Sequence, residues 1–396
     1  MKYDFETIIN RYPQGAEKWL SMKNKNNQIN DDIIPFSIAD MEFVLAPEIS
    51  NGLIEYLKKG AVLGYTLPTD EYYNSVINWM NTNHNWDITK EWICVSNGVI
   101  PALFDLVKAY TQVGDGVILM PPVYYPFYNA IEANNRKIVS CPLKNNNMHY
   151  EIDFALLIKL ARKPENKLLI FCSPHNPVGR VWSIEELKEL ANICMENNVI
   201  IISDEIHNDL IMPGFTHTVL ASINKEISNK VITCTAPSKT FNLAGVQVSN
   251  IIIENSKLRN LYKEEQSRSG FDCMGSFAYL TCKLAYNCGK NWYKELIKII
   301  YNNYNILKKY LSDNLPQVKV YPLEGTYLVW LDFCAFGLTK QELEEKLIKE
   351  CNVFMDEGYM FGDAGNLFER MNIACPTSKI VEALDRICKV FNQKSS

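Results

Sequence analysis

The sequence lacks three features that mark large classes of protein. Its twelve cysteines stand singly, with no Cys-x-x-Cys pair, which argues against a structural zinc site of the usual spacing, and we expect no metal. No stretch approaches the roughly 18 apolar residues that a membrane span needs. Basic and acidic residues nearly balance, at 40 against 45, so no polyanion-binding face is indicated. These absences argue against nucleic-acid and membrane partners.

The first fifteen residues also lack the apolar core of a signal peptide. Most cysteines sit in apolar runs, as small buried hydrophobic residues do, and such usage suits a reducing compartment. What the sequence does have is apolar material. Of its 396 residues 47% are hydrophobic, which is enough for a large core and for more than one domain. We therefore expect a cytoplasmic protein of enzyme size.

Seven short runs rich in β-branched residues predict buried strands, because they are apolar on both faces. Helical stretches lie between several of them. One covers residues 183–197, and Ser183 with the two glutamates after it is typical of a capped helix start. This alternation predicts a mostly parallel α/β sheet covered on both faces. The predicted strands are Trp92–Ser96, Gly116–Met120, Lys137–Cys141, Leu168–Cys172, Val199–Ser203, Val231–Thr235 and Val248–Ile253.

The pattern changes from about residue 291. Long helices now alternate with only two strand-like segments, which predicts a smaller α+β domain. We divide the chain into a segment over 1–50 that joins this small domain, a large domain over 51–290 and the small domain over 291–396. The predicted elements of the last part are a helix over 292–311, strands over 318–321 and 327–332, and helices over 339–351 and 378–391.

Polar motifs follow four of the predicted strands, where active sites of open parallel sheets lie. The segment 96–103 turns from a strand into a helix, and a helix start suits a phosphate. The segment 173–179 has the composition of an ordinary turn. Asp204 directly follows a strand, where a carboxylate usually caps the next element but can also face a cationic ring nitrogen. Lys239 taken alone indicates a solvated loop residue.

The four motifs together are more specific than any one of them. Asp204 stands 28 residues after Asn176, and Lys239 stands 35 residues after Asp204. The Asn-Pro-x-Gly turn, the Asp and the Ser-Lys pair in this order resemble the fold-type I enzymes that use pyridoxal 5'-phosphate (PLP), the aminotransferase class I and II superfamily. The resemblance runs from about residue 38 to 376. It implies the aspartate aminotransferase fold, with a mostly parallel seven-stranded sheet, a smaller α+β domain and PLP bound to the large domain.

A narrower resemblance, to the MalY/PatB cystathionine β-lyase branch, rests on further segments. His207 belongs to it, since aminotransferases commonly carry Tyr at that place. Thr377 departs from it, because the branch often has a basic residue there. No Arg stands in 241–250, where aminotransferases often bind phosphate, which fits the lyase branch and leaves more of the phosphate to the helix start and to hydroxyls. The matching segments are 38–43, 64–66, 203–207, 238–242, 324–328 and 370–376.

The resemblance implies a role for each residue around the cofactor ring. Lys239 holds PLP as a Schiff base and, once displaced by the substrate, becomes the base at Cα. Asp204 pairs with the ring nitrogen, and Asn176 bonds the ring hydroxyl with His207 beside it. Tyr124 stacks on the ring face.

At the phosphate, the resemblance implies the amides of Val99 and Ile100 and the hydroxyl of Ser238, with Thr235 as a further candidate. Tyr65 is implied as a catalytic and phosphate-binding residue that reaches the site of a neighbouring subunit. The site then requires a homodimer.

At the substrate, the resemblance implies that Arg370 binds the carboxylate, since a guanidinium matches its two oxygens. Ala39 and Asp40 line the same end of the pocket. The implied substrate is therefore a small amino acid.

We expect a PLP-dependent C–S β-lyase that releases thiol, pyruvate and ammonia from cystathionine or related cysteine S-conjugates. A class I or II aminotransferase is the alternative, because both routes use the same residues. A regulator that has lost catalysis is a third, opposed by the retention of Asn176, Asp204, Lys239 and Arg370. A nicotinamide dehydrogenase would need a Gly-x-Gly-x-x-Gly turn after a strand, which the sequence lacks.

Overall fold

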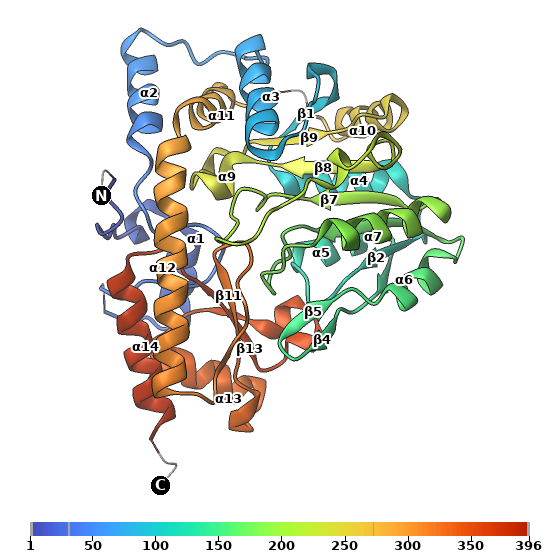
Figure 1. Ribbon diagram of the computed structural model, residues 1–396. Coiled ribbons are helices and arrows are strands. Elements are labelled where there is room, and N and C mark those ends of the chain that lie inside the picture. Colours follow the sequence, from blue (N-terminus) through green and yellow to red (C-terminus); the bar gives the residue numbers. More distant parts are fainter. Residues whose placement is uncertain (1–2, 31, 272, 394–396) are drawn as a thin grey trace.

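The computed structural model describes residues 3–30, 32–271 and 273–393, and its largest feature is a seven-stranded sheet (Figure 1). The strand order is β1-β9-β8-β7-β6-β2-β3. β9 runs antiparallel to both neighbours, and the other neighbouring pairs are parallel. The predicted mostly parallel sheet is confirmed, with each strand within two residues of its predicted range. The strands are β1 (Ile93–Ser96), β2 (Gly116–Leu119), β3 (Lys137–Ser140), β6 (Asn166–Cys172), β7 (Ile200–Asp204), β8 (Val231–Thr235) and β9 (Ser249–Ile252).

Apolar side chains cover both faces of this sheet, because successive residues of a strand point to opposite faces. In β6, Leu168 and Ile170 belong to one apolar cluster, with α4, α5 and α10. Leu169 and Phe171 belong to the other, with α6 and α7. This two-sided burial explains why the strands carry no alternation of polar residues. The covering helices are α4 (Val99–Tyr110), α5 (Pro126–Glu132), α10 (Ser256–Arg268), α6 (Phe154–Ala161) and α7 (Ile184–Glu196).

Three helices precede the sheet in sequence, and α11 packs against two of them, α2 and α3. α7 starts as predicted, with a capping box between Ser183 and Glu186. The loop between α2 and α3, residues 59–69, lies on the surface (Figure 1). The bounds of these helices are α1 (Glu17–Lys25), α2 (Pro47–Lys58), α3 (Asp70–His84) and α11 (Ser276–Cys288).

A second, antiparallel sheet of four strands lies beside the long helix α12 and the C-terminal helix α14 (Figure 1). Its order is β10-β11-β13-β12. The N-terminal segment joins it through Phe36, whose N–H donates to the Phe354 carbonyl at 2.7 Å and whose carbonyl accepts from the Asn372 N–H at 2.8 Å. The division of the chain at residues 50 and 290 stays a prediction. These elements are α12 (Lys290–Asn314), β10 (Lys319–Val320), β11 (Leu328–Asp332), β12 (Asp356–Glu357), β13 (Phe368–Asn372) and α14 (Thr377–Phe391).

The single helix expected over 339–351 is wrong in one respect. α13 (Lys340–Glu345) ends early, and the chain continues as a π-helical turn, Lys346–Glu350. The remaining elements are short: β4 (Lys144–Asn146), β5 (His149–Glu151), α8 (Lys225–Ser228) and α9 (Pro237–Thr240), with 3-10 turns at Tyr12–Gln14, Lys90–Trp92, Leu220–Ser222, Ala244–Val246, Cys334–Phe336, Gly358–Phe361 and Asp363–Gly365. In the part of the chain that the structure describes, no helix has the length and apolar character of a membrane span.

Candidate functional site

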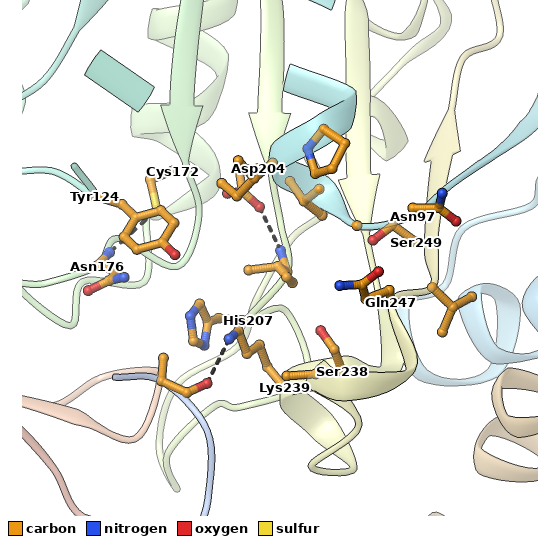
Figure 2. Close-up of a pocket in the computed structure, with 18 residues that line it drawn as sticks. Asn97, Tyr124, Cys172, Asn176, Asp204, His207, Ser238, Lys239, Gln247 and Ser249 are labelled. Carbon is orange, nitrogen blue, oxygen red and sulfur yellow. Dashed lines mark hydrogen bonds between the residues drawn. The ribbon is translucent and has the colours of Figure 1, made fainter. Parts of the chain in front are cut away.

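A pocket of about 230 Å³ lies at the carboxyl ends of the parallel strands, where the sheet topology predicts it. The segments that follow β6, β7 and β8 supply much of its wall. Figure 2 shows its side chains in two groups, with Lys239 between them. One group consists of Tyr124, Asn176, Asp204 and His207, and the other of Asn97, Ser238, Gln247 and Ser249.

Lys239 lies on the short helix α9, four residues after the end of β8. Its Nζ donates a hydrogen bond to the Ala39 carbonyl at 2.6 Å. Burial of the amine lowers the pKa of Lys239 to about 8, with Arg370 adding to the fall and Asp40 opposing it. A free amine with this pKa is far more often unprotonated near neutral pH than an exposed lysine is.

Asp204 is the last residue of β7, and its Oδ1 accepts a hydrogen bond from the Ile206 N–H at 3.1 Å. Burial raises the pKa of Asp204 to about 7, although the Ile206 N–H and the charge of Lys239 oppose the rise. The pocket thus holds a carboxyl group whose charge is costly until a cation lies opposite it. Such an environment favours the binding of a protonated ring nitrogen.

Asn176 links the pocket to the second sheet. Its Oδ1 accepts a hydrogen bond from Nη1 of Arg370 at 2.9 Å. Arg370 lies on β13 and is 1% exposed. Its Nε and Nη2 donate to Oδ2 of Asp356 at 3.2 and 2.5 Å. Arg370 therefore lies just behind the pocket wall, joined to the pocket by Asn176.

The start of α4 forms one end of the pocket. Gly98 is its N-cap, with φ of +129°, and no side chain caps the amides that follow. Val99 and Ile100 line the pocket there. Oγ of Ser249 is buried at the same end and has no hydrogen-bond partner among the described residues. Unpaired N–H groups, a free hydroxyl and a helix dipole together suit a phosphate.

His207 and Tyr124 lie on the opposite side of the pocket, as Figure 2 shows. Nδ1 of His207 is buried without a hydrogen-bond partner among the described residues. Burial lowers the pKa of His207 well below its usual value, so the ring is neutral. Its ring meets that of Tyr327 edge to face at 5.9 Å between centroids. Burial likewise raises the pKa of Tyr124, which keeps its hydroxyl protonated.

Besides Arg370, three of the predicted site residues do not line this pocket. Tyr65 is fully exposed at 104% in the loop between α2 and α3, and does not line the pocket of its own chain. The Asp40 carboxylate contacts Arg11 at 2.7 Å and Lys18 at 3.3 Å. Burial alone would raise the pKa of Asp40, but Lys18 and Arg11 lower it. Only its neighbour Ala39 lines the pocket. Thr235 does not line the pocket either; its Oγ1 donates to the Asn250 carbonyl at 3.3 Å. Substrate binding by Asp40 stays a prediction.

Sequence reasoning missed four residues of this region. Ser249 and Gln247 line the phosphate end, and both stand in the stretch 241–250, where the only predicted feature of phosphate binding was the absence of an Arg. Tyr327 donates its hydroxyl to the Ala39 carbonyl at 2.8 Å and belongs to a segment that carried the resemblance. The sequence does not indicate a role for Asp356, because only the pairing of β12 with β13 brings it next to Arg370.

The chain resembles known proteins along most of its length. The family model "Aminotransferase class I and II" matches residues 31–387. Cystathionine β-lyase PatB of Bacillus subtilis is 40% identical over 90% of this chain and 92% of its own length. Protein MalY of Escherichia coli is 30% identical over 96% of both chains. The solved structure of cystalysin from Treponema denticola, which contains PLP, superposes with a TM-score of 0.97 at 45% identity over 99% of both chains.

Proposed function

Because this chain belongs to the aminotransferase class I and II family, and within it to the MalY/PatB branch, we propose that it is a PLP-dependent C–S β-lyase. Its substrates are cystathionine or related cysteine S-conjugates, and its products are a thiol, pyruvate and ammonia. The observation that carries the proposal is the convergence of Lys239, Asp204 and Asn176 on one pocket in a chain so similar to PatB.

The residues of the pocket fit PLP at both ends. The uncapped amides of Val99 and Ile100 and the unpaired hydroxyl of Ser249 would hold the phosphate. The buried carboxyl of Asp204 would pair with the ring nitrogen, and that pairing would remove the cost of ionising it. Ser238, 9% exposed, lies beside Lys239 at the phosphate side.

Bound in this pocket and joined to the substrate's amino group, PLP would supply the electron sink that makes the proton at Cα removable. The Lys239 amine, displaced by the amino group of the substrate, takes that proton. The Ala39 carbonyl accepts one N–H of the amine at 2.6 Å and so directs its lone pair. The low pKa of about 8 means that the amine is a competent base near neutral pH.

Arg370 binds the substrate's carboxylate in this proposal. The guanidinium is buried and anchored by Asn176 and Asp356, so it is fixed before the substrate arrives. Preorganised donors of this kind lose less conformational entropy on binding. With the carboxylate fixed at Arg370 and the amino group at the cofactor, Cα is presented to Lys239.

Elimination then follows from the substrate's own structure. Loss of the Cα proton to Lys239 allows the C–S bond at Cβ to break, and the electron pair leaves with sulfur. The proton held by Lys239 can return to the departing sulfur, which gives the thiol. Water hydrolyses the remaining three-carbon enamine to pyruvate and ammonia. The overall reaction consumes one water and needs no oxidant or keto acid.

An aminotransferase is the second candidate, because the same residues would remove the Cα proton and the matching family model carries that description. Purified holoenzyme with L-cystathionine tests the two. We expect pyruvate, thiol and ammonia in equal amounts without added keto acid. Absence of pyruvate and thiol, together with rapid keto-acid-dependent amino transfer, would contradict the lyase.

We also propose a homodimer in which Tyr65 completes the neighbouring site. Around Tyr65 the surface loop exposes Val62, Leu63 and Leu67 at 83%, 60% and 69%. A second cavity, lined by Leu63, shares Asn97 and Gln247 with the phosphate end of the pocket. An exposed apolar loop next to the phosphate end supports an interface there.

All twelve cysteines are free, which supports a cytoplasmic location.

A further inference from the structure

The segment 38–40 reaches the pocket through Ala39, which lines its wall. Ile38 has φ of +52°, in the left-handed region that a β-branched residue rarely adopts. Such a conformation persists only when surrounding bonds hold it. Asn372 supplies two of them, because its Nδ2 donates to the carbonyls of Ile38 and Asp40, each at 2.7 Å.

The middle residue of this segment, Ala39, presents its carbonyl to the reaction site. This carbonyl accepts from Lys239 Nζ at 2.6 Å and from the Tyr327 hydroxyl at 2.8 Å. The position of the carbonyl therefore sets the direction of the Lys239 amine. A displacement of the segment would misdirect the base without touching Lys239.

Asp356 holds this segment and Arg370 with the same oxygen. Its Oδ2 accepts from the Ile38 N–H at 2.9 Å and from Nε and Nη2 of Arg370 at 3.2 and 2.5 Å. Asp356 is 6% exposed and lies opposite Arg370 in the register of β12 and β13. One buried carboxylate oxygen thus connects the carboxylate-binding residue to the strained segment that orients the base.

We propose that Asp356 is a positioning residue that fixes Arg370 and, through Ile38, the Ala39 carbonyl that directs Lys239. The inference rests on the roles given to Arg370 and Lys239 in the proposed function. It adds that the Asp356 carboxylate holds both Arg370 and the segment that directs Lys239. The positions of Arg370 and Lys239 are therefore coupled. The position of the Asp356 oxygen matters here, and its charge alone does not suffice.

Hydrogen exchange of the protein without PLP tests the structural half. Asp356→Ala removes the acceptor of the Ile38 N–H, and we expect peptides over residues 36–42 to exchange at least tenfold faster. Asp356→Asn keeps an oxygen at that place, so its exchange should stay within about twofold of the native rate. Glu357→Gln is the matched control, because Glu357 is the neighbouring β12 residue and equally buried, at 7%. Native-like exchange of residues 36–42 in Asp356→Ala would overturn the proposal.

The chemical half is tested in the holoenzyme by exchange of the α-proton of L-alanine with solvent deuterium. This reaction needs Lys239 and Arg370 but no C–S cleavage, so it reports on Asp356 even if the lyase proposal fails. We expect Asp356→Ala to lower the maximal exchange rate at least tenfold and to raise KM, with Asp356→Asn and Glu357→Gln near the native values. Asp356→Glu keeps the charge but displaces the oxygen, and should lose at least fivefold.

A double variant separates the link from Asp356 to Arg370 from its link to Lys239. If Asp356 acted through Arg370 alone, adding Asp356→Ala to Arg370→Ala would change nothing further. We expect a further fall of at least threefold in the maximal rate, because the Ala39 carbonyl is still misplaced. Equal maximal rates in Arg370→Ala and in the double variant would overturn the link from Asp356 to Lys239. If Asp356→Ala does not fold, Asp356→Glu decides, since native-like exchange and rates in that variant would overturn the proposal.

Discussion

Burial shifts the pKa values of Lys239 and Asp204 in opposite directions. Burial lowers the pKa of Lys239 to about 8 and raises that of Asp204 to about 7, so both side chains move toward their uncharged forms. A cationic ring nitrogen opposite Asp204 restores the charge of this carboxylate. The pocket is thereby suited to a ligand with a basic ring nitrogen, and the amine is suited to accept a proton.

Asp204 should make the stability of the PLP-free protein fall as pH rises. Its pKa is about 7 in the folded protein against 3.8 ordinarily, so between these values the folded state binds a proton that the unfolded state has lost. A difference of this size corresponds to roughly 4 kcal/mol at most. Urea unfolding from pH 4 to 8 should show this loss in the native protein relative to Asp204→Asn. Parallel pH profiles of the two proteins would contradict it.

Single residues also show where sequence reasoning ends. Lys239, Asp204 and Asn176 could be predicted, because their order and spacing resemble the fold-type I PLP enzymes and each follows a buried strand; the structure places all three at one pocket. Asp356 could not, because its partners Ile38 and Arg370 come from other segments, and its contact with Ile38 spans 318 residues of sequence. The ion pairs of Asp40 with Arg11 and Lys18 are likewise a product of folding.

Among the elements, the buried strands were the most predictable. Their sequences are apolar on both faces, and only the interior of a covered sheet accommodates that. The helix expected over 339–351 breaks into α13 and a π-helical turn, since periodicity predicts helical residues but not which backbone hydrogen bonds they form. The helix start at α4 carried a phosphate prediction, and the structure adds the unpaired Ser249 from β9.

Ser249 should contribute measurably to PLP affinity. Its hydroxyl is buried and unpaired at the phosphate end, and a hydrogen bond to a charged group contributes about 1.5 kcal/mol, or about tenfold in Kd. We expect Ser249→Ala to weaken PLP binding five- to tenfold in a fluorescence titration. Thr233→Val is the control, because Thr233 on β8 also has a buried unpaired hydroxyl but does not line the pocket. Equal Kd values for the two variants would exclude this role.

At the scale of the molecule, we propose that a second chain accounts for the position of Tyr65. Its side chain is fully exposed, yet the loop that carries it lies beside the phosphate end of the pocket. In a two-fold dimer, if the loop of one subunit contacts the phosphate end of the other, the reverse contact also forms. Each site would then consist of residues from two chains.

Mixing two inactive variants tests this shared site. Lys239→Ala and Tyr65→Ala are each expected to be nearly inactive as purified dimers. After dissociation and reassociation of an equal mixture, half of the dimers are hybrids, and each hybrid contains one intact site. Lyase activity should therefore recover to about a quarter of the native value, a consequence of two-fold symmetry. Light scattering confirms the dimer, and no recovery in verified hybrids would contradict the shared site.

The central claim is that Lys239 carries PLP and serves as the base of a C–S lyase. Borohydride reduction of the holoenzyme, followed by peptide mass spectrometry and paired with a cystathionine assay, tests it most directly. The account predicts one pyridoxyl adduct, on Lys239, and loss of both the adduct and pyruvate release in Lys239→Ala. An adduct on another lysine, or near-normal turnover in Lys239→Ala, would contradict it.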